Sequence, residues 1–339
     1  MFCAAIGLPL LYIATDRSSK FPFPTTIGDI FFLPRETKFY FAHDFPPRHA
    51  LTRLHRKAMS GLLGEQTEFG EVILGNNGWM FLGPALFNGD LPQGILRERL
   101  ETHERRAQFC QQLGISYYVV PAPAKENLYV EHLPIRLQRF IDRSLEVTQL
   151  QRYLSTKSDD INCVYLLNRL RKWKTKGKLF FKTDVHWNDL GAFAASQEAM
   201  RQILPDLGFP PPPRNTPYDI SFQKTPGGNE AQILGIRNKV EETYPELKVL
   251  DGRNPTLVDG RPIKVDAINF LNFDRTGVHT VCPEGEIASG MVFHDSFGAA
   301  LAPFLGRYFK SCSFYWQEFS DELVRKKRPL VIIDLVNTF

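Results

Sequence analysis

The chain has 339 residues, of which 43% are hydrophobic and 23% charged, and it contains 27 Phe and 11 Tyr. This composition is typical of a globular protein and excludes disorder over most of the chain. The length predicts about two domains or one large one. The 41 Lys and Arg exceed the 37 Asp and Glu by only +4, a charge too small and too dispersed for a dedicated nucleic-acid binder.

Residues 1–20 contain an uncharged apolar run over residues 2–14, which is followed by Asp16, Arg17 and Lys20. The run is short for a bilayer span, which needs about 20 apolar residues, and it lacks the basic start of a signal peptide. We expect it to be the back half of an export signal or membrane anchor whose start lies upstream of Met1. The alternative is a buried apolar arm.

Residues 21–70 are predicted to join this segment to the folded domain. Residues 21–47 are rich in Pro and aromatic side chains, a composition that predicts an extended arm. Residues 48–63 have apolar side chains at helical spacing among basic ones, which predicts an amphipathic helix. The main folded domain is then predicted over residues 71–339.

In that domain, alternating strand and helix patterns predict an α/β fold with a mostly parallel sheet. The predicted strands cover residues 72–74, 115–120, 164–167, 179–181, 291–294 and 330–333. The predicted helices cover residues 94–113, 145–154, 189–204, 299–309 and 317–327. Residues 205–217 and 251–285 are expected to leave the sheet. The five cysteines form no C-x-x-C pair, so they predict neither a zinc site nor a redox site.

The first segment with chemical potential is KLFFKTDVHWNDLGA at residues 178–192, in which a predicted strand is followed by Asp184 and His186. Ligands of parallel sheets lie beyond the carboxyl ends of the strands. An Asp two residues before a His can accept its Nδ1 proton and raise the basicity of the ring. The alternative is a helix-capping Asp beside a His that faces the core.

The second segment is GMVFHDSFGAALAPFL at residues 290–305, where a predicted strand ends just before Ser296 and a helix follows. A serine in this turn presents its hydroxyl near free backbone N–H groups that can stabilise an oxyanion. The alternative is a serine that only caps the helix. Because Asp, His and Ser all follow predicted strands, the sequence predicts an acid, a base and a nucleophile in one site.

The two segments resemble the motifs of the AlgX/AlgJ family, the SGNH-hydrolase-like polysaccharide O-acetyltransferases of bacterial alginate and related exopolysaccharide systems. The resemblance rests on T-D-x-H-W-N-x-x-G-A at residues 183–192, H-D-S-F-G at 294–298, D-F-P-P-R at 44–48, G-N-N-G-W-M-F-L at 75–82 and V-P-A-P-A-K at 120–125. It implies an SGNH-hydrolase-like three-layer sandwich with a circularly permuted motif order, since the serine follows the Asp and His.

The resemblance also implies roles for individual residues. Ser296 is the nucleophile, His186 the general base and Asp184 its orienting partner. The stretch GNEAQILG at residues 228–235 is similar to the family's G-D-L-x-x-x-L-G, with Asn in place of Asp. On physical grounds, the Gly228 and Asn229 amides could donate to an oxyanion alongside the Ser296 amide.

Further candidates would contact the substrate. Trp187 could stack on sugar rings, although a Trp in a predicted core is also a structural residue. Lys125 and Tyr129 follow a strand end and are predicted to line the cleft. The basic residues between 169 and 178 could attract an anionic polymer or form a solvated face. No metal or other cofactor is expected, because Asp184 and His186 lack a third ligand at a recognisable spacing.

The sequence therefore predicts an exported, periplasmic protein tethered to the inner membrane. By the resemblance, it transfers an acetyl group to hydroxyls of an alginate-like polysaccharide through an acyl-serine, and a membrane-bound acyltransferase supplies the acetyl group. One alternative is a carbohydrate acetyl-esterase with the same triad. The other is a non-catalytic polysaccharide-binding or assembly subunit.

Overall fold

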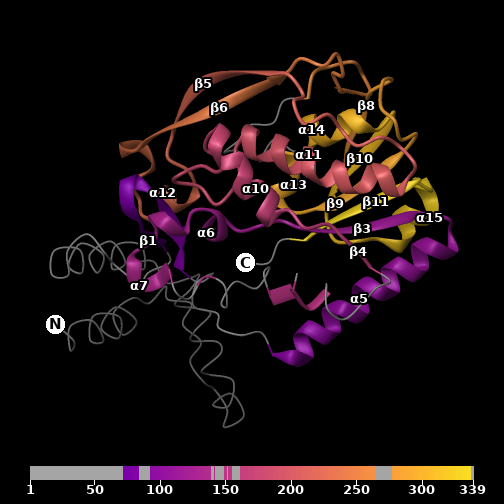
Figure 1. The fold of residues 1–339 in the computed structure, drawn as a ribbon, viewed down its shortest axis with the longest axis horizontal. Coiled ribbons are helices and arrows are strands. Elements are labelled where there is room, and N and C mark those ends of the chain that lie inside the picture. The colour runs from indigo at the N-terminus through magenta and orange to yellow at the C-terminus, as the bar shows by residue number, and fades with distance from the viewer. Residues whose placement is uncertain are drawn as a thin grey trace, which may run out of the picture. The chain divides into compact units, whose positions relative to one another are not determined.

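A computed structural model of the protein describes residues 72–83, 92–138, 141, 149–150, 152–154, 161–263 and 277–336 (Figure 1). The predicted signal or anchor, the arm, the helix over residues 48–63 and the motif at 44–48 lie outside these residues. So does about half of the helix predicted over residues 145–154. Within the described ranges, no helix is both long enough and apolar enough to cross a bilayer.

The strands of the described residues lie in three sheets. They are β1 (Val72–Leu74), β2 (Met80–Leu82), β3 (Ser116–Pro121), β4 (Asn162–Cys163), β5 (Tyr218–Pro226), β6 (Glu241–Val249), β7 (Thr256–Leu257), β8 (Val278–Val281), β9 (Gly290–His294), β10 (Ser311–Trp316) and β11 (Val331–Val336).

The α-helices are α5 (Gln93–Gln112), α6 (Lys125–Leu128), α7 (Ile135–Gln138), α10 (Leu167–Trp173), α11 (Asp189–Asp206), α12 (Asn229–Ile233), α13 (Ser296–Ala299), α14 (Ala302–Leu305) and α15 (Asp321–Lys327). Short 3₁₀ helices cover Asn76–Gly78, Val130–His132, Lys174–Lys176, Arg237–Lys239 and Gly306–Tyr308.

The main sheet has the strand order β4-β3-β11-β9-β10-β8-β7. The first five of these strands are parallel to one another, whereas β8 and β7 add antiparallel pairs at one edge. Every residue of β9 is buried, as expected for a central parallel strand covered on both faces. The prediction of an α/β fold with a mostly parallel sheet is therefore confirmed.

Helices cover both faces of this sheet (Figure 1). Side chains of α10, α11 and α14 pack in one apolar core, which contains Phe193, Val292 and Ile333. Side chains of α5 and α15 pack in a second core with Val119, Phe293 and other residues of the sheet. The result is a helix–sheet–helix sandwich, as predicted.

Several predicted elements differ from those in the structure. Residues 179–181 form no strand, because only an isolated bridge between Phe180 and Trp187 is present there. No strand covers residues 164–167, because β4 already ends at Cys163 and α10 begins at Leu167. The helix predicted over 299–309 is broken into α14 and a 3₁₀ turn after α13. Strands β2, β7, β8 and β10 and the β5–β6 hairpin are absent from the predicted elements. The expectation that residues 251–285 leave the sheet is wrong for β7 and β8, which join the main sheet.

Candidate active site

Ser296 lies at the carboxyl end of the central strand β9, at the first position of α13. Asp295 caps this helix, and its Oδ1 accepts the Phe297 amide at 2.9 Å. The turn is tight, since a Cβ at Gly298 would lie 2.5 Å from His294 Nδ1. Only glycine allows α13 to pack this closely on the end of the strand. The half-buried Ser296 is therefore held at the carboxyl end of the sheet.

Asp184 and His186 lie in a loop between Phe180 and Trp187, which the isolated bridge between these two residues closes. The expectation that they follow a strand of the main sheet is wrong. The loop closes on itself because the Phe181 amide donates to the His186 carbonyl at 3.2 Å. It leads directly into α11, whose first turn is capped by Asn188.

The structure brings Ser296, His186 and Asp184 into one hydrogen-bonded chain. His186 Nε2 lies 2.7 Å from Ser296 Oγ, and His186 Nδ1 lies 2.6 Å from Asp184 Oδ1. Because an ionised carboxylate only accepts, Nδ1 carries the proton and Nε2 is left as the acceptor for the serine hydroxyl. This is the tautomer that a general base for Ser296 needs.

Asp184 is fully buried, and burial alone would raise its pKa. The hydrogen bond and charge of His186 oppose this effect, as do the amides of Asn229 and His186, and the pKa of Asp184 is lowered overall. The Asn229 amide donates to Oδ2 at 2.8 Å, and the His186 amide donates to Oδ1 at 3.0 Å. Asp184 therefore stays ionised next to the imidazole.

The oxyanion role expected for Gly228 and Asn229 is wrong. The Gly228 amide donates to Thr183 Oγ1 at 3.0 Å, and the Asn229 amide donates to Asp184. Both N–H groups are thus used to hold the loop of the base, and neither is left for a substrate oxygen. The expected contribution of the Ser296 amide is unaffected, since the first N–H groups of a helix have no acceptor within it.

Two buried side chains that hold the same loop come from distant parts of the chain. Glu242 on β6 accepts the Thr183 amide at 3.0 Å and the Thr183 hydroxyl at 2.8 Å. Lys125 Nζ donates to the Asp184 carbonyl at 2.9 Å and to Glu230 Oε1 at 2.6 Å. Burial raises the pKa of Glu230 to about 7 although Lys125 opposes the shift.

All three side chains expected to contact substrate are buried and serve the core instead. Lys125 is 1% exposed and forms the ion pair with Glu230. Trp187 is fully buried, and its Nε1 donates to the Phe297 carbonyl at 3.0 Å. The Tyr129 hydroxyl accepts the Leu179 amide at 2.8 Å. The substrate-binding expectation for these residues is therefore wrong.

Most of the basic stretch lies on α10 and the 3₁₀ turn that follows it, and Lys174 Nζ lies 4.6 Å from the centroid of the Tyr129 ring. Arg169, Lys172 and Lys176 line a hollow of about 230 Å³ together with Glu198. Among the described residues, no group of three or more His, Cys, Asp or Glu is placed to hold a metal ion.

Comparison with known proteins places the chain in a family. The model of the SGNH hydrolase-like domain of acetyltransferase AlgX matches residues 72–256, which include Asp184 and His186. The probable alginate O-acetylase AlgJ of Pseudomonas aeruginosa PAO1 is 25% identical over 201 residues. That match covers 56% of this chain and 48% of AlgJ, so the chain spans about half the length of this relative.

Two solved structures share the fold. Bacillus cereus PatB1 with a sulfonyl adduct has a TM-score of 0.60 at 17% identity, over 78% of this chain and 94% of PatB1. A DHHW family protein from Eubacterium siraeum has a TM-score of 0.59 at 15% identity, over 81% of this chain and 92% of that protein. Because the AlgX model matches more than half of the chain, the chain belongs to the family of SGNH hydrolase-like domains of the acetyltransferase AlgX.

Proposed function

We propose that the protein is a polysaccharide O-acetyltransferase that works through an acetyl-Ser296 intermediate. The observation that carries this proposal is the chain of short hydrogen bonds from Ser296 Oγ through His186 to the ionised Asp184. Membership of the AlgX family and the similarity to the probable alginate O-acetylase AlgJ support acetyl transfer as the reaction.

In the first half-reaction, Ser296 Oγ attacks the carbonyl carbon of an acetyl donor while its proton passes to His186 Nε2. Asp184 stabilises the imidazolium, and the Ser296 amide donates to the developing oxyanion. The carbonyl re-forms as the bond to the leaving group breaks, and His186 returns the proton to that group. Acetyl-Ser296 remains.

In the second half-reaction, His186 Nε2 takes the proton of a sugar hydroxyl whose oxygen attacks the acetyl carbonyl. The bond to Ser296 Oγ breaks, Oγ regains the proton from His186, and the acetylated sugar leaves. With water as the acceptor, the same steps make the protein an esterase.

The acetyl donor and the location belong to the same proposal. A membrane-bound acyltransferase would supply the acetyl group in the periplasm, and residues 1–20 would bring the protein to the inner membrane. Fractionation of cells that express the protein from its native locus tests this part, because recovery only from the cytoplasm would contradict both the location and an exported substrate.

The test of the chemistry follows acetylation of Ser296 by an activated acetyl ester, read by mass spectrometry of the peptide that contains it. Ser296→Ala and His186→Ala should abolish the adduct, and Asp184→Asn should slow its formation by roughly 10⁴-fold, as in serine proteases. Ser221→Ala, an exposed serine on β5, is the matched control.

An oligosaccharide acceptor should then discharge acetyl-Ser296 faster than water does. Discharge that no sugar accelerates would contradict transfer and favour the esterase. If the wild type and Ser296→Ala give the same result, the protein is a non-catalytic binding or assembly subunit.

A further inference from the structure

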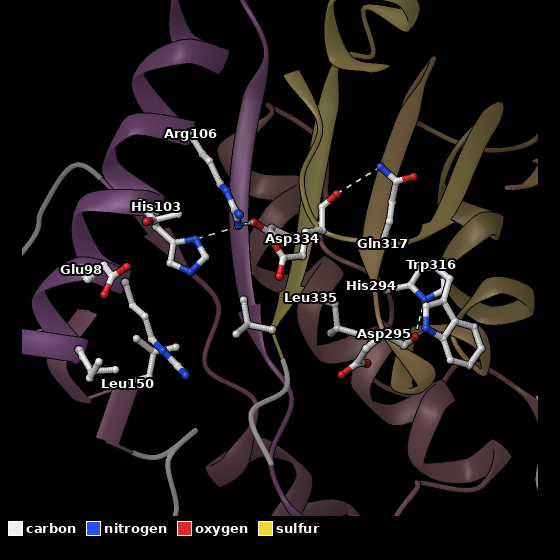
Figure 2. Close-up of a pocket in the computed structure, with 15 residues that line it drawn as sticks. Glu98, His103, Arg106, Leu150, His294, Asp295, Trp316, Gln317, Asp334 and Leu335 are labelled. Atoms are coloured by element: carbon white, nitrogen blue, oxygen red, sulfur yellow. Dashed lines mark hydrogen bonds and ion pairs between the residues drawn. The ribbon is translucent and has the colours of Figure 1, made fainter. Parts of the chain in front are cut away.

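A cavity of about 690 Å³ lies where β9, β10 and β11 end, between these strand ends and α5 (Figure 2). In the sheet, Trp316 pairs with His294 and Asp334 pairs with Phe293, so the lining residues lie at one level of three neighbouring strands. The wall includes Asp295, the residue that precedes Ser296 and caps its helix. The wall of the cavity therefore includes the chain neighbour of the proposed nucleophile.

A polar cluster lines the α5 side of this cavity, and the mechanism above does not use it. Asp334 Oδ2 accepts the Tyr117 hydroxyl at 2.6 Å and an Arg106 NH1 proton at 2.8 Å. His103 Nδ1 lies 2.9 Å from the Tyr117 oxygen. Because the Tyr117 proton goes to Asp334, His103 Nδ1 is the donor, and its Nε2 is left as an acceptor at the cavity wall.

The described lining residues make the cavity negative. They include four carboxylates, Glu98, Asp295, Glu318 and Asp334, but only two guanidinium groups, Arg99 and Arg106. Burial lowers the pKa of both His103 and His294 to about 4, so neither adds positive charge at neutral pH. One of the two guanidinium groups, Arg106, already forms an ion pair with Asp334 at 2.8 Å.

The wall also offers an aromatic surface. Trp316 is half-buried at the end of β10, and its ring centroid lies 6.2 Å from that of His294. An indole face suits the C–H face of a sugar, while carboxylates and His103 Nε2 can accept hydrogen bonds from hydroxyl groups. The volume lies within the range of about 300–1,000 Å³ of small-molecule sites.

We propose that this cavity binds the acceptor sugar next to Ser296 and that it takes an uncharged pyranose in preference to a uronate. This inference rests on the proposed function, since it names the acceptor of the second half-reaction. A uronate carboxylate would enter a site whose own carboxylates outnumber its cations, and such like-charge contacts discriminate against a ligand. An uncharged ring meets the same groups as hydrogen-bond partners.

The first experiment measures binding by calorimetry in the Ser296→Ala background, where no acetyl transfer interferes. Cellotetraose is the uncharged probe and tetragalacturonate the anionic one. Cellotetraose should bind at least tenfold more tightly than tetragalacturonate. Trp316→Ala should weaken cellotetraose binding at least tenfold, whereas Phe222→Ala, which removes an exposed aromatic ring of β5, should not change it.

The second experiment reverses the charge preference and does not depend on the Trp316 variant folding. Glu98→Gln with Glu318→Gln should shift the ratio of the two affinities at least tenfold towards tetragalacturonate. Glu101→Gln, an exposed residue of α5 that does not line the cavity, is the matched control. Equal or tighter binding of tetragalacturonate by the parent protein would overturn the inference, as would cellotetraose binding that Trp316→Ala leaves unchanged.

These binding measurements are independent of the acetylation of Ser296. If the ester fails to acetylate Ser296 but cellotetraose binds as expected, the proposed reaction falls and the cavity stands as a site for uncharged sugars. If acetylation succeeds but cellotetraose does not bind, the acetyl-Ser296 intermediate stands and this inference falls.

Discussion

Replacing Gly228 with alanine should slow the acetylation of Ser296, although none of the three residues Ser296, His186 and Asp184 is itself replaced. A Cβ at Gly228 would lie 2.5 Å from Asp184 Oδ2 and 2.8 Å from Asp184 Cγ, whereas ordinary contacts begin near 3.4 Å. The nearest atom is Asp184 Cβ at 2.3 Å, so the Asp184 side chain would have to retreat by about 1.1 Å, the difference between 3.4 and 2.3 Å. Its bond of 2.6 Å to His186 Nδ1 would then lengthen or break.

A misplacement of about 1 Å can cost about 10²-fold in rate, which corresponds to about 2.7 kcal/mol of activation free energy. The assay is the rate of acetyl-Ser296 formation from the activated ester, with thermal unfolding measured in parallel. Gly94→Ala is the matched control, because a Cβ at Gly94 meets nothing within 4 Å. Acetylation of Gly228→Ala at the wild-type rate would refute the argument that Asp184 needs this space.

Three further predictions concern the groups that support the site. Lys125→Met should lower the free energy of unfolding in denaturant by about 3–5 kcal/mol, because it leaves the Glu230 carboxylate buried without its cation; wild-type stability would contradict this. His103 should make the protein less stable in acid. Its pKa is about 4 in the folded protein and 6.5 in the unfolded chain, so the unfolded chain binds the proton first as the pH falls. The free energy of unfolding should therefore fall by roughly 3 kcal/mol between pH 6.5 and pH 4. His103→Gln should flatten that pH profile, and an unchanged slope would refute the assignment. Trp187→Phe should cost about 1–3 kcal/mol of stability by removing the indole hydrogen bond to the buried Phe297 carbonyl, while sugar affinity stays constant. Weaker sugar binding would restore the stacking role.

The elements next to the candidate nucleophile were predictable because their signals are local. Strand β9 is a run of apolar residues that ends at a polar turn, and α11 begins at the Asn188 cap. Asp184 and His186 are two residues apart, so their pairing also follows from the sequence. The position of their loop outside the main sheet did not follow, since an isolated bridge has the same apolar pattern as a short strand.

The side chains that hold the loop were not predictable, because their partners lie far along the chain. Glu242 bonds Thr183 across 59 residues, and Lys125 bonds Glu230 across 105 residues. Lys is rarely buried in proteins, which made Lys125 look like a surface residue of a cleft. Gly228 and Asn229 were assigned to the correct region, but only coordinates show that their amides face Thr183 and Asp184.

The separation of the proposed base and nucleophile also has a consequence for the order of folding. His186 and Ser296 meet across 110 residues of chain, and the contacts that fix the Asp184 loop come from α6, α12 and β6. Closing such long segments costs entropy before their contacts repay it. During refolding, helix and sheet signals should therefore recover earlier than the reactivity of Ser296, which makes acetylation of this serine a late reporter of the finished fold.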